Sequence, residues 1–254
     1  MSLKKILIVD DEKKIIEVVK AYLEKEGFKI LTANDGAVIM MGGFGLCGIP
    51  ENLIRALVKN GSKDIIIISN NAGVDDAGIG LLINNNQVKK MVATYIGENS
   101  VIEKKVINGE MEVELNPQGT FSERLRAGGA GIGGFYTPTG VGTVIEKGKE
   151  KKIIDGKEFI LELPLKADFA FVKAFKADPY GNLIYRKTAR NFNPMMATAA
   201  DFTIAEVEEI VPVGGLNPEQ IATPGVYVNM VIKGEHYDKR IEKRVYSKAG
   251  SPGA

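Results

Sequence analysis

The sequence of 254 residues contains one cysteine, one histidine and no tryptophan. A single cysteine, Cys47, excludes an internal disulfide and is typical of a reducing compartment. Because His236 is the lone histidine, no cluster of histidine, cysteine and carboxylate residues has the spacing of a metal site. We therefore expect neither a disulfide nor a bound metal.

Long apolar runs and an excess of charge are also missing. No apolar run approaches the ~20 residues that a membrane-spanning helix needs, and the apolar stretch at residues 6–9 is too short for a signal peptide. The 33 basic and 32 acidic residues nearly cancel, which leaves no basic footprint for nucleic acid. We expect a cytoplasmic protein that binds neither membranes nor nucleic acid.

Glycine, in contrast, is abundant, with 29 residues that cluster between apolar segments. The segment at residues 38–54 reads VIMMGGFGLCGIPENLI, a β-branched strand, a glycine-rich turn and the start of a helix. Pro50 suits the first helical position, and a helix that begins there presents free N–H groups and the positive end of its dipole. Such a turn is a seat for phosphate, carboxylate or an oxyanion. The alternative is a tight corner that binds no ligand.

The spacing of Gly43, Gly45 and Gly48 also matches the dinucleotide-binding fingerprint. That fingerprint needs an acidic residue at the end of the next strand, to bind the ribose. Here the next predicted strand is followed by Asn70 and Asn71, which are uncharged amides. Nicotinamide binding is therefore not favoured.

Strands and helices are predicted to alternate along the first half, with strands over residues 4–9, 28–32, 38–41 and 65–69, and helices over residues 13–26 and 50–60. A helix is expected near residues 120–127, and residues 81–114 are ambiguous. The second half is richer in strands, with a hairpin over residues 151–161 and strands over residues 169–175, 202–207 and 226–232. We predict an α/β fold, an open and mostly parallel sheet flanked by helices, with a β-rich excursion in the second half.

From about residue 35 to residue 244, a set of segments occurs in a specific order: GGFGLCGIPENLI, SNNAGVDDAGIGLL, YIGEN, GEMEVELNPQGTFSERLRAGGAGIGGFYTPTGVGT, DFAFVKAFKAD, YRKTARNFNPMMATAA and VEEIV. Together they resemble the A subunits of the 3-oxoacid (succinyl-CoA:3-ketoacid, or acetoacetate) CoA-transferase family. The resemblance implies an enzyme that transfers CoA between succinyl-CoA, or another acyl-CoA, and a 3-oxoacid such as acetoacetate. It also implies the fold of family I CoA-transferases.

In this family the nucleophilic glutamate lies on the B subunit. The resemblance therefore implies no catalytic residue in this chain and a hetero-oligomer with a B subunit. Coenzyme A is a substrate, and no further cofactor is implied. Asn70, Asn71 and Gln118 match amides near the reacting carbonyl. The CoA-binding loop of the family matches Gly42, Gly43, Phe44, Gly45, Leu46, Cys47 and Gly48.

Simpler roles remain open for these residues. Asparagine readily caps its own turn, and Cys47 is expected to be a small apolar filler. The glutamates, Glu206 among them, match no nucleophile motif and are expected to be mostly solvated surface charges. Two interpretations stay open for three basic residues, Arg186, Lys187 and Arg190. They could contact CoA phosphates or a carboxylate of a partner. Alternatively, they could be solvated or lie between subunits.

The first 36 residues resemble a different family. KKILIVDDEKKIIEVVKAYLEKEGFKILTANDG is similar to the opening strand, helix and strand of a response-regulator receiver domain, with Asp10 and Asp11 at the Mg²⁺-binding acidic pair. The later receiver strands are missing, and acidic residues also suit a helix N-terminus. The hypothesis is a chimera with a receiver-like segment at 1–36, a transferase domain at 37–246 and a flexible tail at 247–254. A non-catalytic chimera is the alternative function.

Overall fold

The computed structural model describes residues 5–8, 29–32 and 35–240. Strands β1 (Lys5–Ile8) and β2 (Lys29–Thr32) pair in parallel and form a two-stranded sheet of their own. The parallel pairing agrees with the predicted β-α-β unit. The predicted helix at 13–26, the acidic pair and the predicted tail lie outside the described residues.

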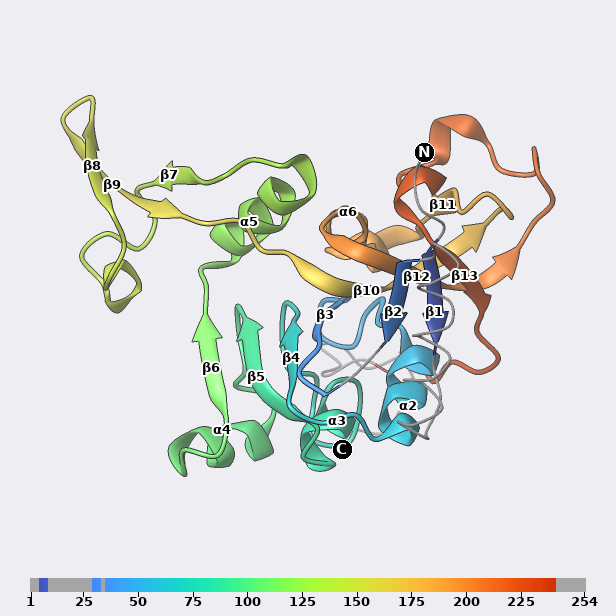
Figure 1. Ribbon diagram of the computed structural model, residues 1–254, viewed down its shortest axis with the longest axis horizontal. Coiled ribbons are helices and arrows are strands. Elements are labelled where there is room, and N and C mark those ends of the chain that lie inside the picture. Colours follow the sequence, from blue (N-terminus) through green and yellow to red (C-terminus); the bar gives the residue numbers. More distant parts are fainter. Residues whose placement is uncertain (1–4, 9–28, 33–34, 241–254) are drawn as a thin grey trace, which may run out of the picture.

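The main sheet of eight strands has a parallel body (Figure 1). Its strands run in the order β13 (Met230–Lys233), β12 (Ala200–Ile210), β10 (Ala167–Ala177), β3 (Val38–Met41), β4 (Ile65–Ile68), β5 (Val88–Ala93) and β6 (Glu112–Leu115). The short strand β11 (Leu183–Ile184) pairs with β10 and is the one antiparallel member among the described strands of this sheet. The first of these strands in the chain, β3, therefore lies in the middle of the sheet, and the direction of winding reverses between β3 and β10.

Helices cover both faces of the sheet, as predicted (Figure 1). One face packs on α2 (Glu51–Asn60), α3 (Gly80–Asn84) and α4 (Ser100–Ile107). The other packs on α5 (Gln118–Ala130) and α6 (Asn193–Thr198). Side chains that alternate along a strand supply the two cores: Ile39 and Met41 face the first group of helices, and Met40 faces the second.

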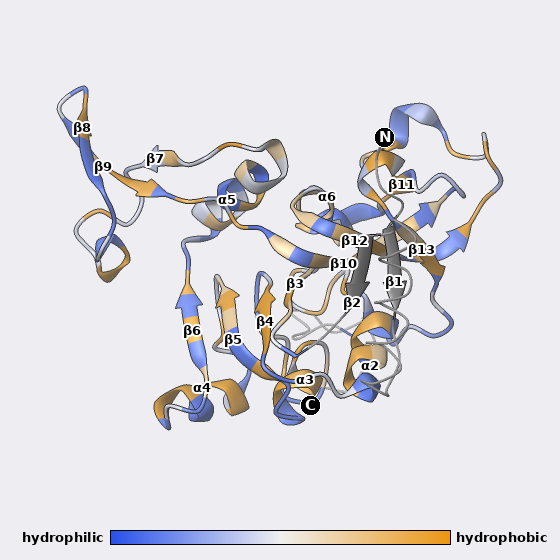
Figure 2. Ribbon diagram, in the orientation of Figure 1, coloured by the Kyte–Doolittle hydropathy of each residue, from blue (hydrophilic) through white to orange (hydrophobic). Residues whose placement is uncertain are grey.

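The hydropathy of the strands follows their place in the sheet (Figure 2). Central strand β4 consists of four isoleucines and is hydrophobic throughout, because both of its faces are covered. Edge strand β6, with the sequence EVEL, alternates charged and apolar residues. The ambiguous region at 81–114 resolves into α3, β5, α4 and β6.

The predicted β-rich excursion is a three-stranded antiparallel sheet that projects from the body (Figure 1). It contains β7 (Phe135–Thr137), β9 (Lys157–Glu162) and β8 (Lys151–Ile154), in that order. Asp155 and Gly156 join β8 to β9 with φ of 49° and 74°, the positive values that a tight hairpin turn requires. We call residues 135–162 the arm.

Short 3₁₀ turns complete the described chain: η1 (Val144–Glu146), η2 (Lys187–Arg190), η3 (Pro218–Gln220) and η4 (Gly225–Tyr227). The strand predicted at 226–232 is wrong in its first half, because η4 occupies residues 225–227 and β13 begins at Met230. After β13, residues 234–240 cross the start of α2. We call these residues the strap. Within the described residues, no helix is long and apolar enough to cross a membrane.

Candidate active site

The glycine loop, residues 42–50, follows β3 at the point where the sheet winding reverses. The N–H of Phe44 donates to the carbonyl of Cys47 at 3.0 Å, and the N–H of Cys47 donates back at 2.9 Å. Gly43 and Gly48 have φ of +134° and +71°, which L side chains rarely adopt. A Cβ at Gly43 would lie 2.5 Å from the Ile49 side chain. The glycines are therefore required by the backbone itself, whether or not a ligand binds.

The fully buried Asn193, at the start of α6, fixes the floor of the glycine loop. Its Nδ2 donates to the carbonyls of Gly48 and Ala189, each at 3.0 Å, and its Oδ1 accepts the N–H of Lys173 at 2.8 Å. A Cβ at Gly42 would lie 1.8 Å from that Oδ1. Sequence reasoning missed Asn193, because an asparagine in NFNP gives no signal of burial or of which distant loop it contacts.

The start of α2 holds an anion, but the anion is a side chain of the chain itself and not a ligand. Glu206 reaches it from β12 and accepts the N–H of Leu53 at 2.8 Å and the Nδ2 of Asn52 at 2.7 Å. Glu206 is completely buried, whereas the sequence reading placed it among the solvated glutamates. An internal carboxylate thus occupies the position that the helix dipole offers to an anion.

The predicted amides lie together at the carboxyl end of the neighbouring strands. Gln118, at the start of α5, donates from Nε2 to the Oδ1 of Asn70 at 2.9 Å, and Thr94 donates to the same Oδ1 at 3.0 Å. Asn70 and Asn71 are buried, and Asn71 pairs with Tyr95 beyond the ends of β4 and β5. The structure brings Gln118 and Asn70 into direct contact across 48 positions of sequence. We call Asn70, Asn71, Thr94 and Gln118 the amide cluster.

The amide cluster and the glycine loop start at the same level of the sheet. Strands β3 and β4 pair in register from Val38 to Met40, and the Ser69 hydroxyl donates to the carbonyl of Met41 at 2.8 Å. Residues 42 and 70 therefore lie just beyond the ends of two neighbouring parallel strands. Ligands of open α/β sheets bind outside such carboxyl ends.

A second loop, residues 73–80, repeats the conformation of the glycine loop after β4. Val74 and Ala77 pair as Phe44 and Cys47 do, and Gly73 and Gly78 again have positive φ. The two loops touch, because a Cβ at Gly78 would lie 3.0 Å from the Leu46 side chain. Few of the side chains match between the two loops, so the sequence gives little sign of this similarity. The glycine loop therefore packs against a loop of similar shape.

Two cavities flank the glycine loop on the side of α2. The smaller, of about 70 Å³, lies between the two similar loops. The larger, of about 150 Å³, lies between the glycine loop and β10, and the strap lines it from the other side. Cys47 borders the larger cavity, with its Sγ 3.4 Å from the hydroxyl of Thr188.

A sequence model of the family described as coenzyme A transferase matches residues 30–234. The chain belongs to the coenzyme A transferase family. It is 57% identical over 209 residues to the A subunit of succinyl-CoA:3-ketoacid coenzyme A transferase from Helicobacter pylori strain J99, covering 82% of this chain and 90% of that one. A probable A subunit of the same enzyme from Bacillus subtilis strain 168 is 56% identical over 229 residues, or 90% of this chain and 95% of the relative.

A longer relative, human succinyl-CoA:3-ketoacid coenzyme A transferase 2, mitochondrial, is 50% identical over 228 residues. The match covers 83% of this chain but 44% of the human one. These comparisons support neither the receiver resemblance nor the chimera hypothesis, and the family match begins at residue 30, within the segment assigned to the receiver.

Solved structures share the fold of this coenzyme A transferase. An acyl-CoA transferase from Escherichia coli O157:H7, in a thioester complex with CoA, superposes with a TM-score of 0.72 at 22% identity, over 79% of this chain and 44% of that chain. Glutaconate coenzyme A-transferase from Acidaminococcus fermentans has a TM-score of 0.66 at 21% identity, over 84% and 73% of the two chains. The predicted open, mostly parallel sheet of this family is confirmed.

Proposed function

We propose that this chain is the A subunit of a succinyl-CoA:3-ketoacid CoA transferase, which acts with a B subunit. The observation that carries the proposal is the identity of 56–57% with bacterial proteins of that name, over 90–95% of their length. The substrates are succinyl-CoA, or another acyl-CoA, and a 3-oxoacid such as acetoacetate. No cofactor is needed beyond CoA as a substrate. With its single cysteine, the chain suits the cytoplasm.

In this proposal the covalent step belongs to the B subunit. Its glutamate carboxylate attacks the acyl carbonyl and forms an anhydride, with release of the CoA thiolate. The thiolate then attacks the glutamyl carbonyl and forms a thioester, with release of the free acid. A carboxylate is a weak nucleophile in water, so the step needs a desolvated and well-positioned site. The present chain supplies one wall of that site.

The amide cluster is proposed to stabilise the negative charge that develops on the reacting carbonyl. Donors that are held in place before the reaction cost no reorganisation when the charge forms. Asn70 meets this condition, because two donors fix its Oδ1 as an acceptor. The Nδ2 of the same amide group is the donor that we propose for the substrate. Asn71 is buried beside it.

The glycine loop is proposed to let CoA approach the backbone closely. Gly42, Gly43 and Gly45 are buried, whereas Phe44 is 51% exposed at the tip of the loop. Because Glu206 already neutralises the start of α2, this contact depends on shape and on backbone hydrogen bonds. The dipole of α2 contributes little to it.

The test uses the chain coexpressed with a cognate B subunit, and measures transfer of CoA from succinyl-CoA to acetoacetate. We expect Asn71→Ala, which removes a donor, and Gln118→Ala, which releases the Oδ1 of Asn70 from one of its two fixing hydrogen bonds, each to lower turnover by about 10- to 100-fold, since a fixed oxyanion donor is commonly worth this much or more. Assembly of the two subunits should be unchanged in size-exclusion chromatography. The matched control is Gln220→Ala, an exposed glutamine in η3.

Two outcomes would count against the proposal. Turnover within twofold of the unaltered enzyme in both variants would remove the amide cluster from the reaction. Full activity of this chain, purified without a B subunit, would contradict the division of labour between the subunits.

A further inference from the structure

The larger cavity beside the glycine loop lies at the switch point of the sheet. Strand β3 leads to α2 on one face, whereas β10 is on the side of the sheet that winds in the other direction. The loops that leave the two strands diverge and open a crevice, which is where open α/β sheets bind ligands. The cavity has a volume of about 150 Å³, and we call it the switch-point cavity.

Three cationic side chains of this cavity converge on one carboxylate, that of Glu208. The Nζ of Lys173 lies 2.9 Å from its Oε1, and on its Oε2 the Nζ of Lys239 lies at 2.9 Å and a guanidinium nitrogen of Arg186 at 3.2 Å. The three cations come from β10, from the strap and from the segment before η2. Glu208 neutralises one positive charge of the three.

The neighbouring carboxylates reduce this excess but leave two cations with one carboxylate between them. Arg240 also lines the cavity, but it makes a bidentate pair with Asp76, at 3.0 and 3.1 Å. Glu51, the other acidic residue of the lining, accepts the backbone N–H groups of residues 238 and 239 and pairs with Arg55. Glu206 caps the start of α2, and its charge also acts on Lys173, so the cations left to share Glu208 are Arg186 and Lys239.

Two of the cations retain hydrogen-bond donors for a ligand. Most of the hydrogen-bond donors of Lys173 already have partners. Its ammonium donates to Glu208 and to the Ala174 carbonyl, and it lies 4.3 Å from the centre of the Tyr237 ring. Arg186 carries five N–H donors and Lys239 carries three. Among the described contacts, each donates once, to Glu208. Both side chains are about half exposed, at 47% and 52%.

We propose that the switch-point cavity is a binding site for a phosphoryl group. Arginine and lysine on one small concave surface, with an excess of positive charge, are the chemistry that recognises phosphate. The Cζ of Arg186 lies 4.2 Å from the centre of the Phe175 ring, so the ring orients the guanidinium group. Phe175 also gives the cavity an apolar wall. Glu208 then acts as an internal competitor for the same cations. Where the phosphoryl group is that of CoA, this proposal rests on the proposed function and deepens it. Binding itself requires neither a B subunit nor acyl transfer, so the two proposals can fail separately.

The phosphoryl group has two possible sources, CoA itself and a separate phosphorylated compound. Isothermal titration of the full chain with inorganic phosphate, CoA and pantetheine distinguishes them. We expect saturable binding of phosphate and none of pantetheine, which lacks phosphate. Competition between CoA and phosphate identifies CoA as the source, and phosphate binding without competition identifies a separate compound. Absence of saturable phosphate binding would overturn the proposal.

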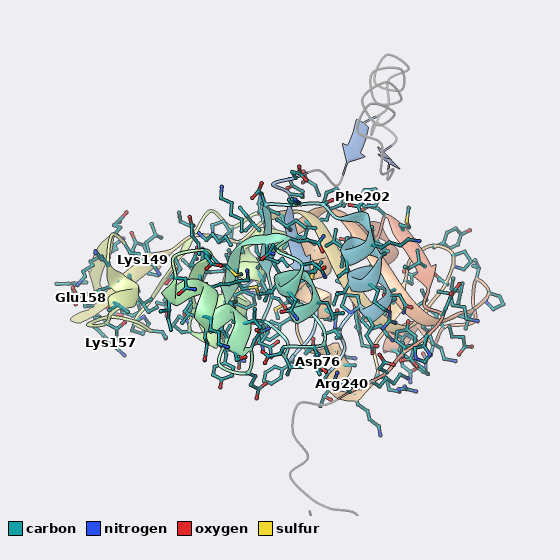
Figure 3. All side chains as sticks on the ribbon, turned by 90° about the horizontal axis from the view of Figure 1, so that it is seen from below. Asp76, Lys149, Lys157, Glu158, Phe202 and Arg240 are labelled. Carbon is teal, nitrogen blue, oxygen red and sulfur yellow. The ribbon has the colours of Figure 1, made fainter. Side chains whose placement is uncertain are left out.

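Variants then assign the binding to the cavity. Lys239→Gln and Arg186→Gln should each weaken phosphate binding by about 5- to 10-fold, as expected for loss of a partly exposed charge-assisted hydrogen bond. The charge-matched control is Lys157→Gln, which lies on the arm, at the far end of the molecule from Arg240 (Figure 3). Equal affinity of the cavity variants and the control would overturn the proposal.

A third variant separates ligand recognition from a purely structural ion-pair network. Glu208→Gln removes the competing carboxylate, so it should tighten phosphate binding by about 3-fold or more. If the three cations serve only to hold the strap, loss of Glu208 loosens them and phosphate binding weakens or stays unchanged. Thermal unfolding of each variant verifies that the chain remains folded. A weaker or unchanged affinity in a folded Glu208→Gln variant would overturn the proposal.

Discussion

Replacement of Glu206 by glutamine tests the assignment of an internal carboxylate to the start of α2. In the folded chain the two carboxylate oxygens each accept one hydrogen bond, from Leu53 N–H and from Asn52 Nδ2. Glutamine has nearly the same shape, but one of its two terminal atoms is an NH₂ donor. Arg55 donates to the Oδ1 of Asn52 at 3.3 Å and holds that amide in its orientation. Whichever way the glutamine amide then turns, one donor of α2 faces another donor in a fully buried site.

The magnitude follows from these contacts. A hydrogen bond to a charged group contributes about 1.5–3 kcal/mol, and a buried donor left unsatisfied costs about 1–3 kcal/mol. The glutamine keeps one neutral hydrogen bond, so we expect the free energy of unfolding to fall by about 2–4 kcal/mol. For a chain whose total stability is on the order of 5–15 kcal/mol, this is a large loss.

Urea unfolding of the purified chain, followed by circular dichroism, measures the change in the free energy of unfolding. The slope of this free energy against urea concentration should be the same in the variant and the unaltered chain. The matched control is Glu209→Gln, on the same strand, which breaks the exposed pair between Glu209 and Lys176 at 2.8 Å. Exposed ion pairs contribute about 0–1 kcal/mol, so the control should remain close to the unaltered chain. A Glu206→Gln variant that lies within about 1 kcal/mol of the control would refute the capping role.

Two further predictions concern the contacts around the glycine loop. Gly42→Ala should lower the free energy of unfolding by about 2–4 kcal/mol, because the new Cβ displaces the Asn193 amide, and it should cost under about 1 kcal/mol in an Asn193→Ala background. Additive effects in urea unfolding would contradict this coupling. For Glu208, burial acts to raise the pKa, but hydrogen bonds and charge from Lys173 and Lys239 outweigh it and hold the pKa below the 4.5 of a free glutamate. The carboxylate therefore stabilises the fold above about pH 4.5, and this stabilisation is lost as the pH falls through the lower, folded-state pKa. The stability difference between the chain and Glu208→Gln should be constant from about pH 6 to 8 and should shrink below about pH 4.5; a difference that does not change with pH would contradict the ion-pair assignment.

The fold could be predicted from local sequence because its elements have strong local signals. Four isoleucines in β4 are typical of a strand covered on both faces, and Asp155-Gly156 specifies a hairpin turn. The ambiguity at residues 81–114 has a physical cause. Helix α3 has five residues, and β6 is a short, half-polar edge strand. Neither is long enough for its hydrophobic periodicity to predict a helix or a strand.

The candidate site could be predicted only in part, because long-range contacts leave no local trace. The glycine loop and the amides were found from their own residues and from the family resemblance. The residues that hold the loop and the helix start in place, Glu206 and Asn193, could not be found in this way. Glu206 lies 153 positions from Leu53, and Asn193 lies 145 positions from Gly48. A glutamate in a strand of mixed polarity reads as solvated when the helix that it caps is not visible in the sequence.

The capped helix determines where charge is available at the carboxyl edge of the sheet. With the α2 dipole satisfied internally, the glycine loop presents a neutral backbone between two different surfaces. On one side, the amide cluster offers fixed, uncharged donors, which suit charge that appears only during a reaction. On the other, Arg186 and Lys239 offer permanent positive charge, which suits a permanent anion. If Glu206 did not occupy the helix start, an anionic group would be attracted to the loop itself and the two surfaces would compete for it. In the two proposals made above, the internal carboxylate thus keeps acyl chemistry and phosphate recognition on opposite sides of one loop.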